Sequence, residues 1–263
     1  MVRMRLVLGL LAAAGGPLIA GATARAADLV AITDRGEFLQ FSSGNPRETI
    51  RRDLQGVGLP LVGIDVRTAD GQLYGIDRGG AIHRIDAGTA IATFQTRLSV
   101  ALVPAESYLV DFDPVADRLR VIGTDGQNLL VDVDTGIAAV HGPVRHGGGT
   151  VPPRIAAGAY SHAAGGAASS RLHLFDGASG TYGLLDPPED GIVRPLSQSP
   201  GRSADAADIA SHGGRDQGYA VISNILHVFD VATGAASAVQ AIGTGATGRA
   251  GRIIDIAVLP PIR

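Results

Sequence analysis

The sequence contains no cysteine, lysine or tryptophan, and each absence removes a class of chemistry. Without cysteine the chain has no disulfide, no thiol nucleophile and no thiolate metal site. Without lysine it has neither a Schiff-base amine nor the lysine of a phosphate-binding P-loop. No G-x-S-x-G motif is present, so nothing supports a serine hydrolase elbow. With no tryptophan and only four glutamates (Glu37, Glu48, Glu106 and Glu189), a glycosidase site with a sugar-stacking platform is hard to assemble.

The first 26 residues are typical of a secretory signal peptide. Met1–Arg5 is basic, the following "LVLGLLAAAGGPLIAGATARA" is apolar, and Ala24-x-Ala26 predicts cleavage after Ala26. Gly15–Pro17 interrupts an apolar run that is already short for a bilayer, so we do not expect insertion into a membrane. The protein is therefore expected in the periplasm or outside the cell.

The mature chain, residues 27–263, is mildly acidic. Removing Arg3, Arg5 and Arg25 leaves 19 basic residues against 25 acidic ones, a net charge of about −6. A surface of this kind, without basic clusters, is not expected to bind nucleic acid or anionic membrane. The chain is long enough to bury its own core, and we expect a single domain that is a monomer.

Four segments of the chain repeat one order of elements: an apolar strand that carries an acid, then three more strands separated by turns. They run from Leu61 to Phe94, from Tyr108 to Val140, from Arg154 to Leu196 and from Ala206 to Ile242. Asp-Gly and Thr-Gly pairs stand where the hairpins must turn, and glycine supplies the positive φ there. No segment shows a sustained helical period.

The two ends of the chain supply a fifth unit. "LVAITDRGEFLQF", from Leu29, lacks a first strand, and "RIIDIAVLP", from Arg252, matches a first strand with nothing after it. Pairing the segment near Ile256 with the strand near Ala31 would close a ring and remove exposed sheet edges. At roughly 47 residues per unit, the sequence predicts an all-β, five-bladed β-propeller closed by its C-terminal strand on the N-terminal blade.

Three segments resemble a known family. "DFDPVADRLRVIGTDGQNLLVDVDTG", "GIDVRTADGQLYGI" and "DPPEDG" are similar to segments of the bacterial exported domain-of-unknown-function family numbered 4394. The resemblance spans essentially the whole mature chain and implies a propeller-like exported protein. It implies no activity and no catalytic residue. The chain departs from the family pattern between Ala139 and Arg154, where a His/Gly-rich loop, 141–153, is expected.

Four aspartates occupy one equivalent position in the predicted first strands: Asp65, Asp111, Asp208 and Asp255. Gly158 takes that position in the remaining unit. Since the first strand of a propeller blade is the innermost, the four carboxylates would meet around the central channel. Two carboxylates about 7 Å apart repel by roughly 2 kcal/mol at an effective dielectric constant near 20. Something must offset this repulsion.

Three explanations for these aspartates remain open. Each carboxylate could accept backbone N–H bonds from its own or the next blade and so fix the spacing of the blades. All four could hold a hard cation such as Ca²⁺ through oxygen ligands. Two could form a catalytic pair. By contrast, Asp113, Asp125 and Asp134 belong to turns, and "DVDTG" lacks the ligand spacing of an EF-hand.

The histidines and arginines give weaker signals. His141 and His146 flank the long loop, and His162 and His212 each follow a first strand; their spacing matches no zinc motif, so we expect solvated loop side chains. Three histidines lie inside predicted strands and are expected to be half-buried side chains rather than ligands: His83, His173 and His227. Arg118 and Arg120 alternate on one strand and are expected to pair with acids such as Asp132.

Two functions fit the sequence. The leading hypothesis is a non-enzymatic exported module that binds or scaffolds a partner in the envelope or outside the cell. It rests on the regularity of the repeats. The alternative is a metal-dependent hydrolase of the lactonase kind, whose channel-mouth metal the four aspartates would hold.

Overall fold

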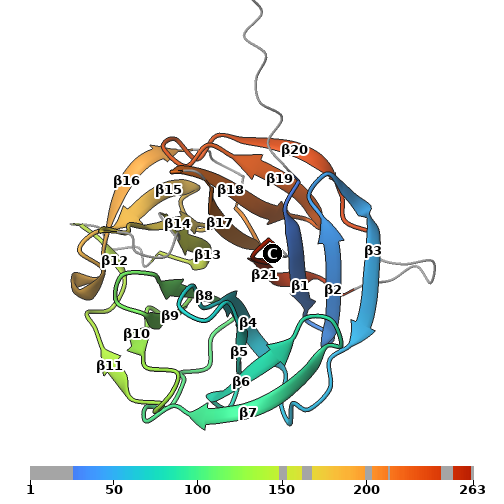
Figure 1. Ribbon diagram of the computed structural model, residues 1–263. Coiled ribbons are helices and arrows are strands. Elements are labelled where there is room, and N and C mark those ends of the chain that lie inside the picture. Colours follow the sequence, from blue (N-terminus) through green and yellow to red (C-terminus); the bar gives the residue numbers. More distant parts are fainter. Residues whose placement is uncertain are drawn as a thin grey trace, which may run out of the picture.

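Five β-sheets stand around a central axis (Figure 1) in the computed structural model, which describes residues 26–147, 153–161, 168–198, 203–212, 214–243 and 251–261. The predicted signal peptide, apart from Ala26, lies outside this part. The described part has one short 3₁₀ helix, η1 (Pro188–Asp190), and is otherwise built of strands and turns. None of its helices is long and apolar enough to cross a membrane.

The chain contributes the sheets, here called blades, in order around the ring. Blade 1 contains β21 (Ile253–Val258), β1 (Asp28–Thr33), β2 (Glu37–Ser42) and β3 (Asn45–Asp53). Blade 2 contains β4 (Leu61–Val66), β5 (Leu73–Asp77), β6 (Ala81–Asp86) and β7 (Ile91–Arg97). Blade 3 contains β8 (Tyr108–Asp113), β9 (Arg118–Gly123), β10 (Asn128–Val131) and β11 (Ala138–Val140).

Blades 4 and 5 complete the circle. Blade 4 contains β13 (Ile155–Tyr160), β14 (Leu172–Asp176), β15 (Thr181–Leu185), β16 (Ile192–Gln198) and the short outer strand β12 (Arg145–His146). Blade 5 contains β17 (Ala206–His212), β18 (Arg215–Ile222), β19 (Ile225–Phe229) and β20 (Ala236–Ala241). The predicted five-bladed β-propeller is confirmed.

The ring closes as predicted, because β21 pairs antiparallel with β1. In this pairing Ala31 lies opposite Ile256, and Leu29 lies opposite Val258. The first and last strands therefore stand side by side near the centre (Figure 1). Blade 1 is thus made from both ends of the chain.

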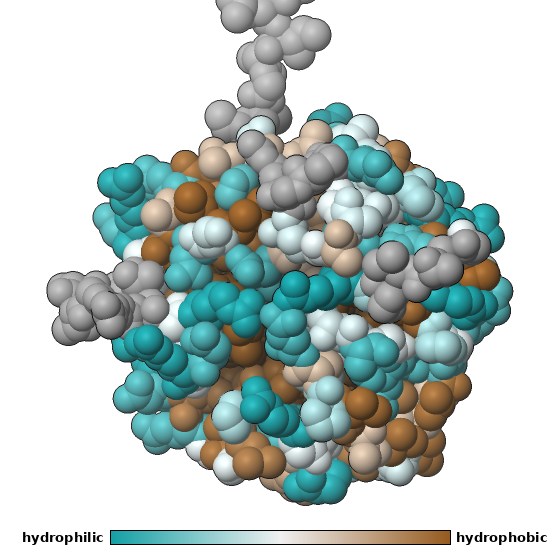
Figure 2. Space-filling model, turned by 180° about the vertical axis from the view of Figure 1, so that it is seen from behind, coloured by the Kyte–Doolittle hydropathy of each residue, from teal (hydrophilic) through white to brown (hydrophobic). Residues whose placement is uncertain are grey.

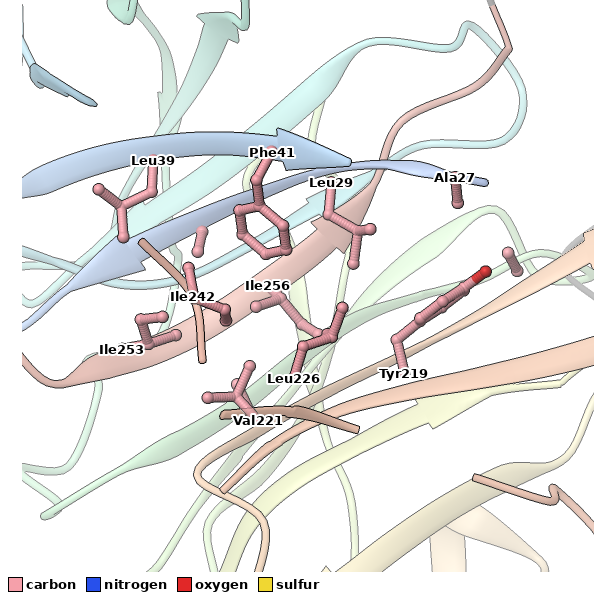
Figure 3. Packing of buried hydrophobic residues seen from close by; sticks show 13 residues of the cluster. Ala27, Leu29, Leu39, Phe41, Tyr219, Val221, Leu226, Ile242, Ile253 and Ile256 are labelled. Carbon is pink, nitrogen blue, oxygen red and sulfur yellow. The ribbon is translucent and has the colours of Figure 1, made fainter. Parts of the chain in front are cut away.

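The hydrophobic core is divided among the five interfaces between neighbouring blades. Successive residues of a strand point to opposite faces of its sheet, and both faces are covered by a blade. In β1, Leu29 and Ala31 pack toward blade 5 and Val30 and Ile32 toward blade 2. This is why the strands read as continuous apolar runs. Figure 3 shows the cluster between blades 5 and 1, where β21 contributes Ile253 and Ile256.

The outer surface is mixed in character. Seen from behind, hydrophilic and hydrophobic residues are interspersed over the face of the ring (Figure 2). Exposed apolar side chains on the outer strands include Ile50 on β3, Phe94 on β7 and Val140 on β11. These side chains belong to different blades.

Part of the predicted His/Gly-rich loop 141–153 is a strand rather than a loop. Arg145 and His146 form β12, which pairs in parallel with β16 along the outer edge of blade 4. The neighbouring Val144 is buried in the cluster between blades 3 and 4. Residues 148–152 lie outside the described part. The connection thus covers an edge strand, which is a known way to protect a sheet edge.

Candidate functional site

The four predicted aspartates all lie on inner strands and are all buried. Asp65 is on β4, Asp111 on β8, Asp208 on β17 and Asp255 on β21, and each exposes only 4–7% of its surface. Their neighbours along the strand are mostly apolar and pack between blades. Each inner strand therefore carries its carboxylate into the middle of the ring.

Each carboxylate accepts a hydrogen bond from the backbone of the next blade. The N–H of Ile64 donates to Asp255 at 2.8 Å, and the N–H of Phe112 donates to Asp65 at 2.6 Å. Likewise the N–H of Tyr160 donates to Asp111 at 2.8 Å, and that of Val258 donates to Asp208 at 2.6 Å. These bonds run in one direction around the ring and join blades 1 to 2, 2 to 3, 3 to 4, and 5 to 1.

Three of the aspartates also bond within their own strand. The N–H groups of Val66, Ile209 and Ile256 donate to the second oxygens of Asp65, Asp208 and Asp255. The structure thus contains the backbone hydrogen bonds, within and between blades, that the first explanation of the aspartates requires. Such bonds also stabilise an ionised carboxylate.

Three of the four carboxylates converge. Oxygens of Asp65, Asp111 and Asp208 lie within 4.8 Å of one another. Asp255 is not in this group, because its carboxylate bonds the N–H of Ile64, one residue before Asp65, and so sits at a different level along the axis. Of the four metal ligands predicted from the sequence, Asp65, Asp111 and Asp208 therefore lie close enough to bind one ion, and Asp255 lies outside this group.

The missing aspartate of blade 4 has a steric cause. A Cβ added to Gly158 would lie 2.3 Å from the backbone oxygen of His173 and 2.5 Å from Leu109. No side chain fits there. The ring therefore lacks a blade 4 carboxylate because β13 runs too close to β14 and to blade 3.

Substitution of Gly158 by alanine should destabilise the protein by about 2 kcal/mol, because the added methyl overpacks a site walled by backbone. For a chain of this size the melting temperature should fall by roughly 4–8 °C, measured by circular dichroism. Gly58→Ala is the matched control: a Cβ there meets nothing within 4 Å, and its melting temperature should stay unchanged. Equal melting of both variants and the parent would contradict the steric explanation.

Burial and mutual repulsion perturb the acidity of the convergent carboxylates. Burial raises the pKa of Asp208 to about 6. Burial, followed by the charge of Asp208, raises the pKa of Asp65 well above its ordinary value. The pKa of Asp111 is raised by burial and then by the charges of Asp65 and Asp208. Burial thus disfavours the ionised form of all three groups, and a bound cation would favour it.

A cavity of about 380 Å³ opens at the end of the ring where the inner strands finish. The three convergent carboxylates line it, whereas Asp255 does not. The other walls are mostly apolar and include Val66, Phe112, Ile209, Val258 and the segment Leu259–Pro261. We call it the axial cavity. Its volume and lining are those of a small-ligand site, in which a few polar groups converge among apolar walls.

Tyr160 is a wall residue that sequence reasoning missed. It is fully buried, its N–H bonds Asp111, and its hydroxyl oxygen accepts a 3.2 Å bond from the guanidinium of Arg120. Burial raises the pKa of this hydroxyl above its ordinary value. Tyr160 belongs to the irregular fourth unit, which has no aspartate to draw attention to its first strand.

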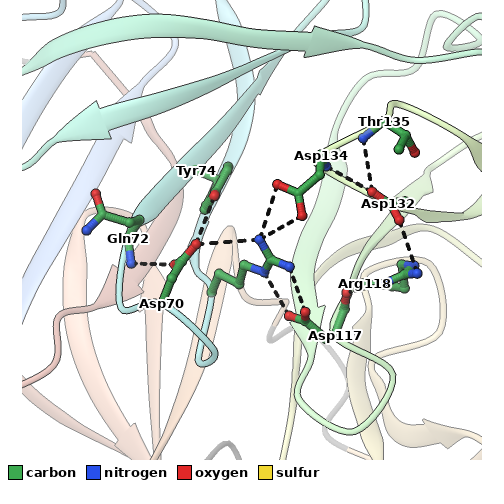
Figure 4. Close-up of polar contacts among 9 residues, drawn as sticks. Asp70, Gln72, Tyr74, Asp117, Arg118, Asp132, Asp134 and Thr135 are labelled. Atoms are coloured by element: carbon green, nitrogen blue, oxygen red, sulfur yellow. Dashed lines mark hydrogen bonds and ion pairs between the residues drawn. The ribbon is translucent and has the colours of Figure 1, made fainter.

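An arginine network ties blades 2 and 3 together near the same end of the ring (Figure 4). Arg67 donates to both oxygens of Asp117, at 2.8 and 2.6 Å, and also contacts Asp70 and Asp134. The hydrogen bonds to Arg67 hold the pKa of Asp117 below its usual range. Arg67 of blade 2 is thus joined to the turn aspartates Asp117 and Asp134 of blade 3. The sequence shows that these aspartates belong to turns but not that they join two blades.

The prediction for the paired arginines is right for one and wrong for the other. Arg118 pairs with Asp132 at 3.1 Å, as predicted. Arg120 is instead buried and donates to neutral groups: the hydroxyl of Tyr160 and, at 2.9 Å, the amide oxygen of Asn128. It also contacts Nδ1 of His141 at 2.9 Å. Arg120 lies two residues further along the same face of β9, where its partners are Tyr160 of blade 4, Asn128 and His141 rather than Asp132.

The histidines make more contacts, and are more deeply buried, than the sequence predicts. His141 contacts Arg120, and burial followed by this positive charge lowers the pKa of its imidazole. His146, expected in solvent, contacts Asp176 at 2.8 Å. His162 and the side chain of His212 lie outside the described residues. The three strand histidines are buried rather than half-buried: His83, His173 and His227.

Comparison with solved structures supports the fold alone. A chain of a nidogen/laminin complex aligns with a TM-score of 0.53 at 12% identity, over 89% of this chain and 98% of that one. A structural genomics protein of unknown function from Bacteroides thetaiotaomicron VPI-5482 aligns with a TM-score of 0.54 at 16% identity, over 90% of this chain and 65% of that one. No curated protein gave a match.

The class is therefore a five-bladed β-propeller with a carboxylate-lined axial cavity. Within it, the chain belongs to the family described as Domain of unknown function (DUF4394), whose model matches residues 37–257. The matched region begins at β2 and ends in β21, so it contains all four aspartates and includes the strand that closes the ring.

Proposed function

We propose that this protein is an exported binding module and that the axial cavity is its binding site. One observation carries the proposal: three buried carboxylates converge in an open cavity whose other walls are mostly apolar. No arginine is among the described residues that line it, so the negative charge has no fixed counter-ion in the wall. A ligand that is a cation, or carries one, is favoured.

Two classes of cation suit three convergent carboxylates. One is a hard metal ion such as Ca²⁺, which takes carboxylate oxygens as ligands. The other is an ammonium group, which donates hydrogen bonds to them. In the first case Asp65, Asp111 and Asp208 are the protein ligands. Asp255 then supports the ring from its own level through its bond to Ile64.

A bound cation should raise the melting temperature. At a concentration one hundred times its Kd, a ligand stabilises the folded state by about 2.7 kcal/mol, or several degrees for a chain of this size. Thermal unfolding of the EDTA-treated protein should be followed while Ca²⁺, Mn²⁺ or an organic ammonium compound is added, with the same anions as controls. Asp111→Asn should abolish the shift. If no cation stabilised the protein, the proposed binding site would be wrong.

Export and a partner in the envelope belong to the same proposal. Export is supported by the basic start, apolar run and Ala24-x-Ala26 of the N-terminal segment, and an exported protein would meet its partner in the envelope or outside the cell. N-terminal sequencing of the protein from the producing cell's envelope fraction checks export, with Ala27 expected as the first residue. The lactonase alternative gains no support, because neither the matched family nor the aligned structural genomics protein carries a named activity.

A further inference from the structure

The axial cavity is larger and more apolar than a metal ion needs. Its 380 Å³ corresponds to about a dozen water molecules at roughly 30 Å³ each. The carboxylates account for one part of the wall only. Phe112, Ile209, Val258 and the segment Leu259–Pro261 form much of the rest, and they come from blades 3, 5 and 1. A ligand that uses the whole cavity must carry an apolar body as well as a positive charge.

The carboxylates are poorly placed to chelate a metal with both oxygens. In Asp65 one oxygen bonds the N–H of Val66 and the other bonds that of Phe112; in Asp208 both oxygens are engaged in the same way. Bidentate ligation would compete with these bonds. Three single oxygens leave at least half of the six to eight positions of Ca²⁺ to water.

The spacing of these oxygens allows the three N–H donors of one primary ammonium group to reach them together. Charge-assisted N–H···O bonds are about 2.8 Å long. Three oxygens at that distance from one tetrahedral nitrogen stand about 4.6 Å apart, and the oxygens of Asp65, Asp111 and Asp208 lie within 4.8 Å of one another. Each acceptor keeps its backbone bond, because a carboxylate oxygen has a second lone pair.

We infer that the axial cavity binds a small primary amine with an apolar body, the ammonium group lying on the three carboxylates and the body against the apolar walls. This inference rests on the proposed function of the cavity and names its ligand class. Leu259–Pro261 is then the wall that limits the size of the body. Pro260 stands 3.9 Å from the Cβ that Gly71 would carry, so the segment reaches the first turn of blade 2.

Isothermal titration of the purified full chain with 2-phenylethylammonium chloride near neutral pH tests the inference. We expect saturable binding of one molecule per chain. The neutral isostere 2-phenylethanol should bind at least tenfold more weakly, because it lacks the charge. A trimethylated ammonium of the same body should also bind at least tenfold more weakly, because it has no N–H to donate. Methylammonium, which lacks the body, should bind more weakly than 2-phenylethylammonium.

Two variants separate the parts of the site. Asp111→Asn keeps an acceptor for the N–H of Tyr160, so it should fold, yet it should bind the amine at least tenfold more weakly. Asp134→Asn, at an exposed turn, should bind like the parent. If Asp111→Asn failed to fold, the four parent titrations would still decide the matter.

The outcomes distinguish this inference from the proposed function. Stabilisation by Ca²⁺ without binding of the amine would overturn the ligand class and leave the cavity as a cation site. Equal binding of the alcohol and the amine would overturn the role of the ammonium group while leaving a ligand cavity. Binding of neither a metal ion nor any amine would overturn both.

Discussion

Removal of residues 252–263 should leave a chain that does not fold. This segment carries β21, whose loss exposes the edge of β1 and removes the fully buried Ile253 and Ile256 from the cluster between blades 5 and 1 (Figure 3). Each large-to-small loss in a core costs about 2–5 kcal/mol, whereas an entire domain is stable by only about 5–15 kcal/mol. The backbone bonds of Asp255 and Val258 disappear as well. Circular dichroism and limited proteolysis measure the result.

A circular permutant is the control for this truncation. The N–H of Leu259 donates to the carbonyl oxygen of Asp28 at 2.8 Å, so β21 can be joined to β1 by a short flexible linker. New ends can be opened at Gly58, where the connection between blades 1 and 2 is exposed. This chain keeps β21 and should fold and melt no lower than the parent. A truncated protein that still melted cooperatively near the parent temperature would show that β21 does not close the ring.

The fold could be predicted from the sequence because its signals are repeated. The sequence shows period-two alternation, turns with Gly at positive φ, and four similar units. Together these signals indicate a propeller of four-stranded blades. The unmatched segments at Leu29 and Arg252 then required closure. Blade 4 was the loosest unit in sequence, and it is also the one where Gly158 replaces the aspartate and β12 adds a strand.

The candidate site could be predicted only in part. Equivalent positions in the repeats identified the four aspartates, but their heights along the axis depend on how each inner strand slides against the next. Asp255 bonds the N–H of Ile64, whereas Asp208 bonds that of Val258, three residues beyond Asp255. This stagger is set by packing between blades. It separates Asp255 from the other three, and no local pattern encodes it.

The same limit explains Arg120 and the cavity walls. Alternation correctly placed Arg118 and Arg120 on one face of β9, but only the neighbouring blade decides what faces each of them. Similarly, Leu259–Pro261 follows the last strand as a short apolar segment with no repeat pattern in the sequence. It becomes a wall of the axial cavity because closure of the ring brings the end of β21 to the axis.

The destabilisation caused by Asp208→Asn should depend strongly on pH. Asparagine keeps one acceptor, but its amide N–H₂ faces one of the two backbone N–H groups that Asp208 satisfies. An unsatisfied buried donor costs about 1–3 kcal/mol, so the variant should be less stable than the parent near pH 5. At higher pH the parent loses this advantage, because it must then ionise a carboxyl that burial disfavours.

The direction of this pH dependence follows from the linkage between proton binding and folding. Burial raises the pKa of Asp208 from 3.8 in the unfolded chain to about 6 in the folded one. The resulting stability is complete below pH 3.8 and is lost as the pH rises through 6, because the folded state binds more protons in that window. A difference of about 2 pKa units corresponds to about 3 kcal/mol. The free-energy penalty of the variant should shrink by roughly that amount between pH 4 and pH 8.

Urea unfolding of parent and variant in EDTA, at intervals from pH 4 to pH 8, measures this penalty. Asp86→Asn is the matched control, since backbone N–H bonding from Thr89 lowers the pKa of Asp86 below 3.8. The contribution of Asp86 is therefore constant above that pH, and the penalty of its substitution should not change between pH 5 and pH 8. A pH-independent penalty for Asp208→Asn would mean that folding does not raise the pKa of Asp208. The buried carboxylate would then be ionised in the folded protein, and a cation or an ordered donor would have to neutralise it.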